Sequence, residues 1–277
     1  MALATIRRSV IGRLPQPLLA SIARLQSRGI REIFRDGDIW IHETDCGYFA
    51  YPQPYLRLDL RLLDQTAKRN FFWGYTPQPG DVIVDIGAGV GEEVLTFAKA
   101  VGPSGKVICV EAHPRTFQCL EALIRYNRLS NVIALQRAVT QPQRAIETID
   151  DSPDYLLNRV GRSHGLSICA TTVDGICNNL GISHINFLKM NIEGAERLAL
   201  RGMASTVTQT DILCICCHDF LADKWGDQSY RTKRAVSDLL HQYGLQVTTR
   251  SEDGAPDFIN HQIWAYSSQF RGNAAAG

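Results

Sequence analysis

Short apolar runs alternate with amphipathic stretches through most of this chain of 277 residues. The clearest run, residues 82–86 (VIVDI), is rich in β-branched side chains, which is typical of a strand buried on both faces. The same pattern predicts strands at 107–111, 131–136, 185–190, 212–217, 245–250 and 259–267, and helices at 92–101, 114–128, 172–180, 195–201 and 230–243. Strands and helices that alternate at this spacing predict an α/β protein with a doubly wound, mainly parallel sheet.

The residues before this regular part follow another pattern. Leu14 to Leu25 has helical spacing, residues 39–60 are irregular and contain prolines, and residues 58–72 return to helical spacing. The stretch 77–80 (PQPG) is a strong breaker just before the first buried strand. We therefore expect an N-terminal extension at 1–79, acting as a lid or an oligomer contact, a main domain at 80–270, and a disordered tail at 271–277.

Residues 1–35 carry seven arginines against one acid, Glu32. One interpretation is a surface helix that packs on the main domain or on a second subunit, as in a homodimer. The other is a helix that lies on a membrane surface or on an acidic partner.

The whole composition is that of a globular protein, with 45% hydrophobic residues, 21% charged residues and a net charge of +1. A charge so close to zero gives no electrostatic case for binding nucleic acid. No apolar run approaches the roughly 20 residues that a membrane-spanning helix needs. The first residues also lack the apolar centre of a secretory signal, so we expect a cytoplasmic protein.

The eight cysteines show no paired CxxC spacing, which favours reduced, mostly buried thiols. A zinc site in the run from Cys214 to His218 is the alternative. Successive residues of a strand point to opposite faces, so few of these groups can converge on one ion. We therefore assign no metal site.

A glycine-rich loop, Gly87–Gly91, joins the first buried strand to the next helix, and Glu111 closes the second strand 24 residues after Gly87. This combination favours an adenosine cofactor, because an acid at that position can accept hydrogen bonds from both ribose hydroxyls. The loop is G-x-G-x-G followed by Glu92 and Glu93, whereas the dinucleotide fingerprint is G-x-G-x-x-G. Two carboxylates there would repel a pyrophosphate but suit the cationic S-adenosylmethionine.

Three motifs resemble the FkbM family of S-adenosylmethionine-dependent methyltransferases: VDIGAGVGEE at 84–93, VEAHP at 110–114 and FLKMNIEGAE at 187–196. Shorter matches lie at 138–139, 171–174 and 202–203. The likeness covers about half of the chain, from Gly80 to His218. It implies a class I methyltransferase (Rossmann-like) fold, with a seven-stranded sheet that ends in an antiparallel hairpin, and O-methylation of small or carbohydrate-containing metabolites.

The resemblance also implies which residues bind S-adenosyl-L-methionine. They are Asp85, Gly87, Ala88, Gly89 and Glu92 in the first loop, Glu111, Ala112 and His113 after the second strand, Arg137 and Ala138 after the third, and Asn191 after the fourth. Among them, Asp85, Gly87 and Gly89 would hold the methionine portion, and Glu111 the ribose. The family usually has Asp at the position of Asn191, so the need for a divalent metal stays open.

A hydroxyl acceptor must lose its proton, so we expect a general base at the strand tips. His218 is the first choice, because its ordinary pKa is near ~6.5. Glu193 is the second. Both also have structural readings: His218 as a hydrogen-bond partner of the backbone, and Glu193 as a helix cap.

These observations predict an O-methyltransferase that acts on a hydroxyl of a small natural product, sugar or glycolipid. We expect the acceptor pocket within residues 38–76 and 141–167, where the pattern is least regular. The alternatives are an NAD-dependent oxidoreductase and a non-catalytic cofactor-binding protein of the same fold. The second is motivated by Asn191 and by Cys216, where family members often have an acid.

Overall fold

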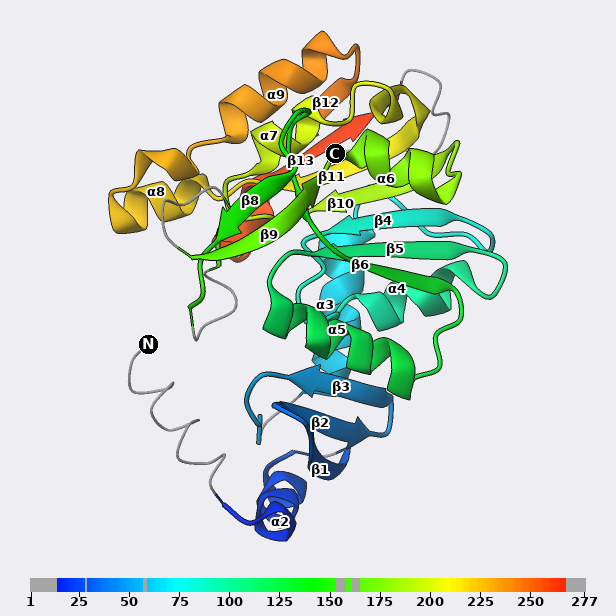
Figure 1. Cartoon of the computed structure of the whole chain (residues 1–277), viewed down its shortest axis with the longest axis vertical. Coiled ribbons are helices and arrows are strands. Elements are labelled where there is room, and N and C mark those ends of the chain that lie inside the picture. The colour runs from blue at the N-terminus through cyan, green and yellow to red at the C-terminus, as the bar shows by residue number, and fades with distance from the viewer. Residues whose placement is uncertain (1–13, 28, 57–58, 153–157, 161–164, 268–277) are drawn as a thin grey trace.

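A seven-stranded sheet forms the centre of the computed structural model, which describes residues 14–27, 29–56, 59–152, 158–160 and 165–267 (Figure 1). Its strand order is β12-β13-β11-β10-β4-β5-β6. The strands are β4 (Val82–Ile86), β5 (Lys106–Glu111), β6 (Val132–Gln136), β10 (Ile185–Met190), β11 (Thr210–Cys216), β12 (Gln246–Thr249) and β13 (Gln262–Tyr266). β13 pairs antiparallel with both β11 and β12, and all other neighbouring strands of this sheet pair in parallel. The predicted class I methyltransferase, Rossmann-like fold, with its closing antiparallel hairpin, is thereby confirmed.

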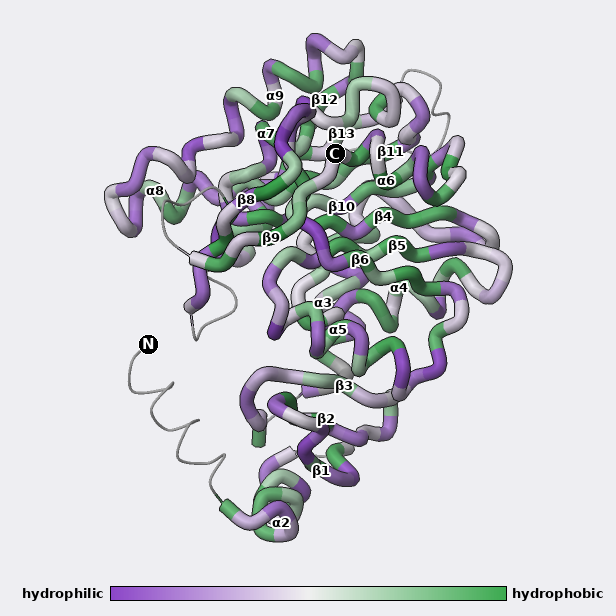
Figure 2. Tube along the Cα trace, in the orientation of Figure 1, coloured by the Kyte–Doolittle hydropathy of each residue, from purple (hydrophilic) through white to green (hydrophobic). Residues whose placement is uncertain are grey.

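Helices cover both faces of this sheet, as the alternation of side chains along β4 requires. Ile83 belongs to one apolar core together with Phe97 and Leu120, whereas Val84 belongs to a second core together with Leu200. The first face carries α3 (Leu60–Phe71), α4 (Val94–Val101) and α5 (Pro114–Tyr126), and the second carries α6 (Val173–Leu180), α7 (Glu196–Arg201) and α9 (Lys233–Gln242). Figure 2 shows hydrophobic residues concentrated along the central strands between these two layers.

The N-terminal residues form a helix and a small antiparallel sheet. The elements are α2 (Gln16–Gln26), β1 (Ile30–Asp36), β2 (Ile39–Thr44) and β3 (Gly47–Tyr51). The helix predicted over Leu14 to Leu25 is confirmed. A helical interpretation of the basic residues 1–35 does not hold for Arg31 and Arg35, which lie in β1, because the chain turns at Gly29, whose φ is +100°. Residues 1–13 lie outside the described part.

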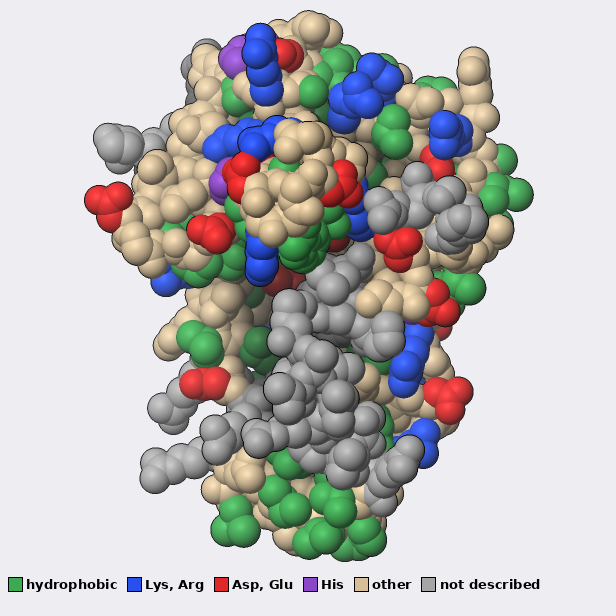
Figure 3. All heavy atoms as spheres, turned by 90° about the vertical axis from the view of Figure 1, so that its left-hand side faces the viewer, with side chains coloured by type: hydrophobic (Ala, Val, Ile, Leu, Met, Phe, Trp, Pro, Cys, Tyr) green, Lys and Arg blue, Asp and Glu red, His purple; other side chains and the backbone are tan. Residues whose placement is uncertain are grey.

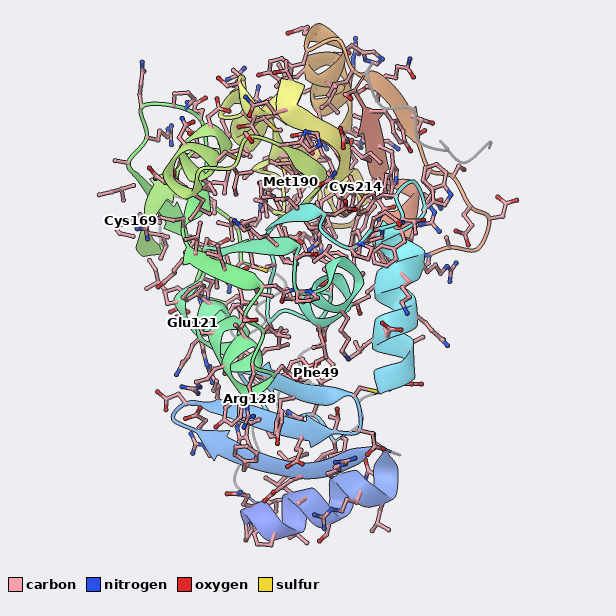
Figure 4. All side chains as sticks on the ribbon, turned by 90° about the vertical axis from the view of Figure 1, so that its right-hand side faces the viewer. Phe49, Glu121, Arg128, Cys169, Met190 and Cys214 are labelled. Carbon is pink, nitrogen blue, oxygen red and sulfur yellow. The ribbon has the colours of Figure 1, made fainter. Side chains whose placement is uncertain are left out.

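This small sheet packs against α5, which separates it from the central sheet (Figure 1). Figure 4 shows Phe49 of β3 beneath the helical layer, and Phe49 belongs to the same core as Ile83 and Phe97. Asn127, at the end of α5, accepts a hydrogen bond from the Tyr48 amide (2.9 Å) and donates one to the Tyr48 carbonyl (2.7 Å). Residues on both sides of position 80 thus share one core, and the division into extension and main domain stays a prediction.

One side of α2 is exposed at the end of the molecule that lies lowest in Figure 3. Leu25 is 88% exposed and Leu18 is 47% exposed, while Leu19 and Ala23 are buried against the small sheet. Two apolar residues at the predicted helical spacing, Leu18 and Leu25, are thus exposed, and the buried side of the helix is narrower than predicted. Whether a second subunit or a membrane surface meets its outer side stays a prediction.

Residues 141–167, which we expected to be irregular, contribute to a third sheet of order β7-β9-β8. Its strands are β7 (Ala138–Val139), β8 (Ile146–Ile149) and β9 (Leu166–Thr171). The remaining short elements are η2 (Thr206–Gln209), α8 (Asp219–Trp225), η3 (Gln228–Tyr230) and α10 (Asp257–Asn260). Of the helices within the described ranges, none is long and apolar enough to cross a membrane. The expected disordered tail lies outside these ranges.

We predict that Asn127→Ala lowers the free energy of unfolding by about 2 kcal/mol or more, because the substitution leaves both backbone groups of Tyr48 without their partner. Chemical denaturation followed by circular dichroism measures this change. Asn179→Ala, at an exposed position of α6, should change the stability little. Equal stabilities of the two variants would show that Asn127 does not dock β3 on α5.

Candidate functional site

A cleft lies at the carboxyl ends of β4, β5 and β10, which is where ligands bind in open parallel sheets. Its floor is formed by the loops that follow these strands, and its outer wall by the third sheet and residues 158–160. The lining residues include Gly87, Gly89, Glu111, Ala112, Thr116, Arg137, Val139, Ile149, Asn158, Val160, Asn191 and Glu193. Seven of the residues predicted from the sequence are therefore brought together: Gly87, Gly89, Glu111, Ala112, Arg137, Asn191 and Glu193.

The tips of β4 and β10 touch at the floor of the cleft. The Asn191 amide donates to the Ile86 carbonyl (2.9 Å), which continues the ladder between the two strands. At Gly87, whose φ is +76°, a Cβ atom would lie 2.0 Å from the Asn191 carbonyl oxygen. No residue with a side chain fits there, so this glycine allows the two loops to approach and to expose their backbone to a ligand.

Glu111 is held at the end of β5 with its carboxylate facing the cleft. Its Oε2 accepts from the Gly89 amide (3.0 Å) and its Oε1 accepts from the His113 amide (2.8 Å). Burial raises the pKa of Glu111, and the two amides act against this rise. Each oxygen keeps a further lone pair, so the carboxylate can accept a second hydrogen bond at each end, as a vicinal diol requires.

Two polar atoms on the cleft wall are buried and have no hydrogen-bond partner within the described part of the chain. They are Oδ1 of Asn191, an acceptor, and Nδ2 of Asn158, a donor. Leaving such groups unpaired costs about 1–3 kcal/mol each. The wall therefore fits a ligand with both donors and acceptors. Asn158 was not predicted, because it lies in a stretch of the sequence that carries no motif.

Asp85 does not line this cleft. Its side chain is fully buried on the other face of the sheet, where Oδ1 lies 2.8 Å from Nζ of Lys189. The same ammonium donates to the Gly87 carbonyl (3.2 Å). Burial alone would lower the pKa of Lys189, but the carboxylates of Asp85 and Glu93 raise it above its ordinary value, so the ammonium stays charged. Asp85 thus makes an internal ion pair, and its predicted contact with the methionine portion of the cofactor stays a prediction.

Lys189 was missed by the sequence analysis although a signal was present. It is the one charged residue inside the apolar strand 185–190, and a lysine in that setting needs a buried partner. The register of β4 and β10 aligns it with Asp85. Parallel pairing of these two strands therefore points to Asp85 as the buried partner of Lys189.

Glu92 faces the N-terminal sheet and does not line the cleft. Its Oε1 accepts a hydrogen bond from the Tyr51 hydroxyl (2.8 Å). Burial and the neighbouring Glu93 raise the pKa of Glu92 to about 7. Glu92 therefore does not contribute to the expected repulsion of a pyrophosphate, which requires a carboxylate that faces the ligand.

Three further predicted residues contribute no lining to the cleft. The ring of His113 is buried, with Nε2 lying 3.1 Å from Asp151 and Nδ1 3.3 Å from Thr116. Ala88 is buried in the first apolar core, and Ala138 of β7 packs with Ile149 of β8 within the third sheet. Their backbones shape the loops, while their side chains support neighbouring elements.

His218, at the junction of β11 and α8, lies between two carboxylates. Nε2 is 3.1 Å from Oε1 of Glu193, and Nδ1 is 3.4 Å from Oε1 of Glu196. Burial alone would lower the pKa of His218, but these two carboxylates reverse the effect and raise it to about 10. The imidazole is therefore already protonated at neutral pH and cannot accept a proton from an acceptor hydroxyl. These contacts disfavour His218 as the general base, and the identity of the base stays a prediction.

The part of the sequence that forms this cleft matches a known protein family. The sequence matches the family described as Methyltransferase FkbM domain over residues 85–244, more than half of the chain. The chain belongs to the FkbM methyltransferase family. The matched range begins in β4 and ends just before β12, so it contains every lining residue of the cleft. No curated protein matches the chain in sequence.

Solved structures resemble the FkbM chain more distantly. An FkbM methyltransferase from Methylobacillus flagellatus is 15% identical, with 74% of this chain and 58% of that one covered and a TM-score of 0.45. Aeropyrum pernix fibrillarin with bound S-adenosyl-L-methionine is 13% identical, with 86% and 98% covered and a TM-score of 0.46. An O-methyltransferase from Bacillus cereus in complex with SAH is 12% identical, with 75% and 80% covered and a TM-score of 0.46. Likeness at this level does not identify a ligand or a substrate.

Metal ligands do not gather in the FkbM chain as far as its residues are described: no group of three or more His, Cys, Asp or Glu side chains could hold an ion. The Cys214–His218 run shows why. Cys214 and Cys216 lie in the first apolar core, on one face of β11, and Cys217 lies in the second. His218 is occupied by its two carboxylates.

We predict that Lys189→Met lowers the free energy of unfolding by about 3–5 kcal/mol, because it leaves the Asp85 carboxylate buried and unpaired. Guanidinium denaturation measures the loss. Lys106→Met, the same change at an exposed position of β5, is the control and should have little effect. The double variant Asp85→Leu/Lys189→Met should recover most of the stability; if it is no more stable than Lys189→Met, the loss does not come from the broken pair.

Proposed function

We propose that this FkbM protein binds S-adenosyl-L-methionine in the cleft and transfers its methyl group to a hydroxyl of a small natural product, sugar or glycolipid. The observation that carries the proposal is Glu111, whose carboxylate faces the cleft beside the glycine loop. A ribose on Glu111 would direct the rest of the cofactor along Gly87 and Gly89 toward Asn191. The unpaired atoms of Asn158 and Asn191 would then meet the donors and acceptors of this ligand.

The charges near the tip of β10 support a cationic methyl donor. With His218 protonated, the group formed by Glu193, Glu196 and His218 carries a net charge of −1 beside the cleft. Asn191 contributes a further oxygen without a charge. A fixed negative field of this kind stabilises a sulfonium, and a pyrophosphate would be repelled by it. The negative charge of these three residues, and not that of Glu92, therefore disfavours a nicotinamide dinucleotide.

We assign the role of general base to Glu193. Its side chain is 19% exposed and lines the cleft, whereas His218 is almost completely buried. The protonated His218 holds the Glu193 carboxylate in place. S-adenosyl-L-methionine, when bound there, would supply the methyl group and leave as S-adenosylhomocysteine. Glu193 would accept the hydroxyl proton as the acceptor oxygen bonds to the methyl carbon, and alignment within the cleft supplies much of the rate.

For the acceptor pocket we propose the side of the cleft formed by the third sheet. Ile149, Asn158 and Val160 come from the stretch 141–167 that we predicted for this role. Residues 38–76 contribute instead to a separate cavity between β3, α3 and α4, which Phe49, Leu63 and Leu95 help to line. The N-terminal extension would then support the cofactor loop through Tyr51 and Glu92.

We predict that calorimetric titration with S-adenosyl-L-methionine shows binding, and that Glu111→Ala weakens it by about tenfold or more. The loss follows from removing an ionised acceptor of two hydrogen bonds, each worth about 1.5–3 kcal/mol. Glu121→Ala, on the exposed side of α5 (Figure 4), is the matched control and should bind as the unsubstituted protein does.

Absence of binding heat at high cofactor concentration would contradict the proposal. Displacement of S-adenosylhomocysteine by NADH would favour the oxidoreductase alternative. A non-catalytic protein would bind the cofactor but transfer no label from it to any hydroxyl acceptor offered.

A further inference from the structure

Arg159 is a buried arginine that no motif of the sequence marks. It lies between Asn158 and Val160, which line the cleft, but its own side chain points away from the cleft lining and is 7% exposed. Its Nε donates a hydrogen bond to the Glu193 carbonyl oxygen (2.8 Å). The backbone of the residue that we assign as general base is thus held by a charged side chain from another part of the chain.

Glu193 needs such a contact because its backbone is strained. Its φ is +51°, in the left-handed region, which costs a residue with a side chain about 1–2 kcal/mol. Gly194 follows with a φ of +102°, and a Cβ atom there would lie 2.9 Å from Nη2 of Arg159. The absence of a side chain at Gly194 therefore makes room for the guanidinium. The strained conformation directs the Glu193 carboxylate to His218.

Arg159 is itself fixed from three directions. Its guanidinium lies 3.6 Å from the centre of the Tyr230 ring, Nη1 is 3.2 Å from Oδ2 of Asp227, and Nη2 is 3.2 Å from the Ser229 hydroxyl. These partners belong to the turn that contains η3, just after α8. A planar group stacked and paired in this way has little freedom left, so it can impose a position on the residue that it binds.

We propose that Arg159 is a positioning residue, which holds the Glu193 backbone in its left-handed conformation and so places the Glu193 carboxylate between His218 and the cleft. The geometric part is independent of the reaction. The catalytic consequence rests on the proposed function, in which Glu193 receives the acceptor proton. Arg159 acts through Glu193 and touches no reacting atom.

The test is a titration of His218 by NMR in histidine-labelled protein, without cofactor. The titratable groups that face His218 are Glu193, Glu196 and, farther away, Cys216 and His261, and the two glutamates raise its pKa to about 10. Arg159→Gln should release Glu193 and lower the midpoint of the His218 titration by about one pH unit or more. Glu193→Gln should lower it as well. Arg159→Lys keeps the charge without the planar fork, and gives a second reading should the glutamine variant not fold.

The decisive comparison is the double variant Arg159→Gln/Glu193→Gln. If Arg159 acts through Glu193, the double variant should titrate like Glu193→Gln alone. An unchanged midpoint in both Arg159 variants, or additive effects in the double variant, would overturn the proposal. Arg231→Gln removes an exposed arginine that pairs with Asp223 beside the same turn, and it should leave the midpoint unchanged. Cofactor binding is measured separately, so failure of the proposed function would not be mistaken for failure of this inference.

Discussion

The buried pair of Asp85 and Lys189 spans the two strands on which the cleft is built. The two residues are aligned in the register of β4 and β10, and the Lys189 ammonium also reaches the Gly87 carbonyl at the start of the glycine loop. A charge removed from water requires a partner in good geometry, so the pair fixes the relative positions of both strands and of the loop. The contact of Gly87 with Asn191 above it depends on that alignment.

Charged residues are held in place at two positions around the cleft: on one face of the sheet and at the tip of β10. On one face, Lys189 holds Asp85, and Tyr51 from the N-terminal sheet holds Glu92, so that the extension reaches the base of the cofactor loop. At the tip of β10, Glu193, Glu196 and the protonated His218 together place a net negative charge beside the cleft. Arg159 completes this arrangement by fixing the Glu193 backbone. Lys189, Glu92 and Glu193 are thus each held by a partner from a distant segment of the chain.

The repeating part of the fold could be predicted from the sequence, because its signals are local. The strands at 82–86 and 185–190 have the predicted bounds, and the crevice at their carboxyl ends follows from parallel pairing. Short elements such as α8 and β8 carried too little periodicity to be recognised.

Side-chain orientation could not be predicted in the same way. Glu92 turns to Tyr51, 41 residues away, and His218 is enclosed by Glu193, from the loop after β10, and by Glu196, the first residue of α7. The sequence suggested the residue types of the site but not which of them face the cleft, since that depends on partners far away in the chain. The protonation state of His218 has the same origin, and it is the reason why we propose Glu193 as the base.

A crystal structure of the protein with S-adenosylhomocysteine tests the central claim most directly. The account predicts that both ribose hydroxyls lie within about 3.2 Å of the Glu111 carboxylate, with the sulfur near Asn191 and Glu193. A ligand bound in the cavity between β3, α3 and α4, or bound in the cleft without any contact to Glu111, would contradict it.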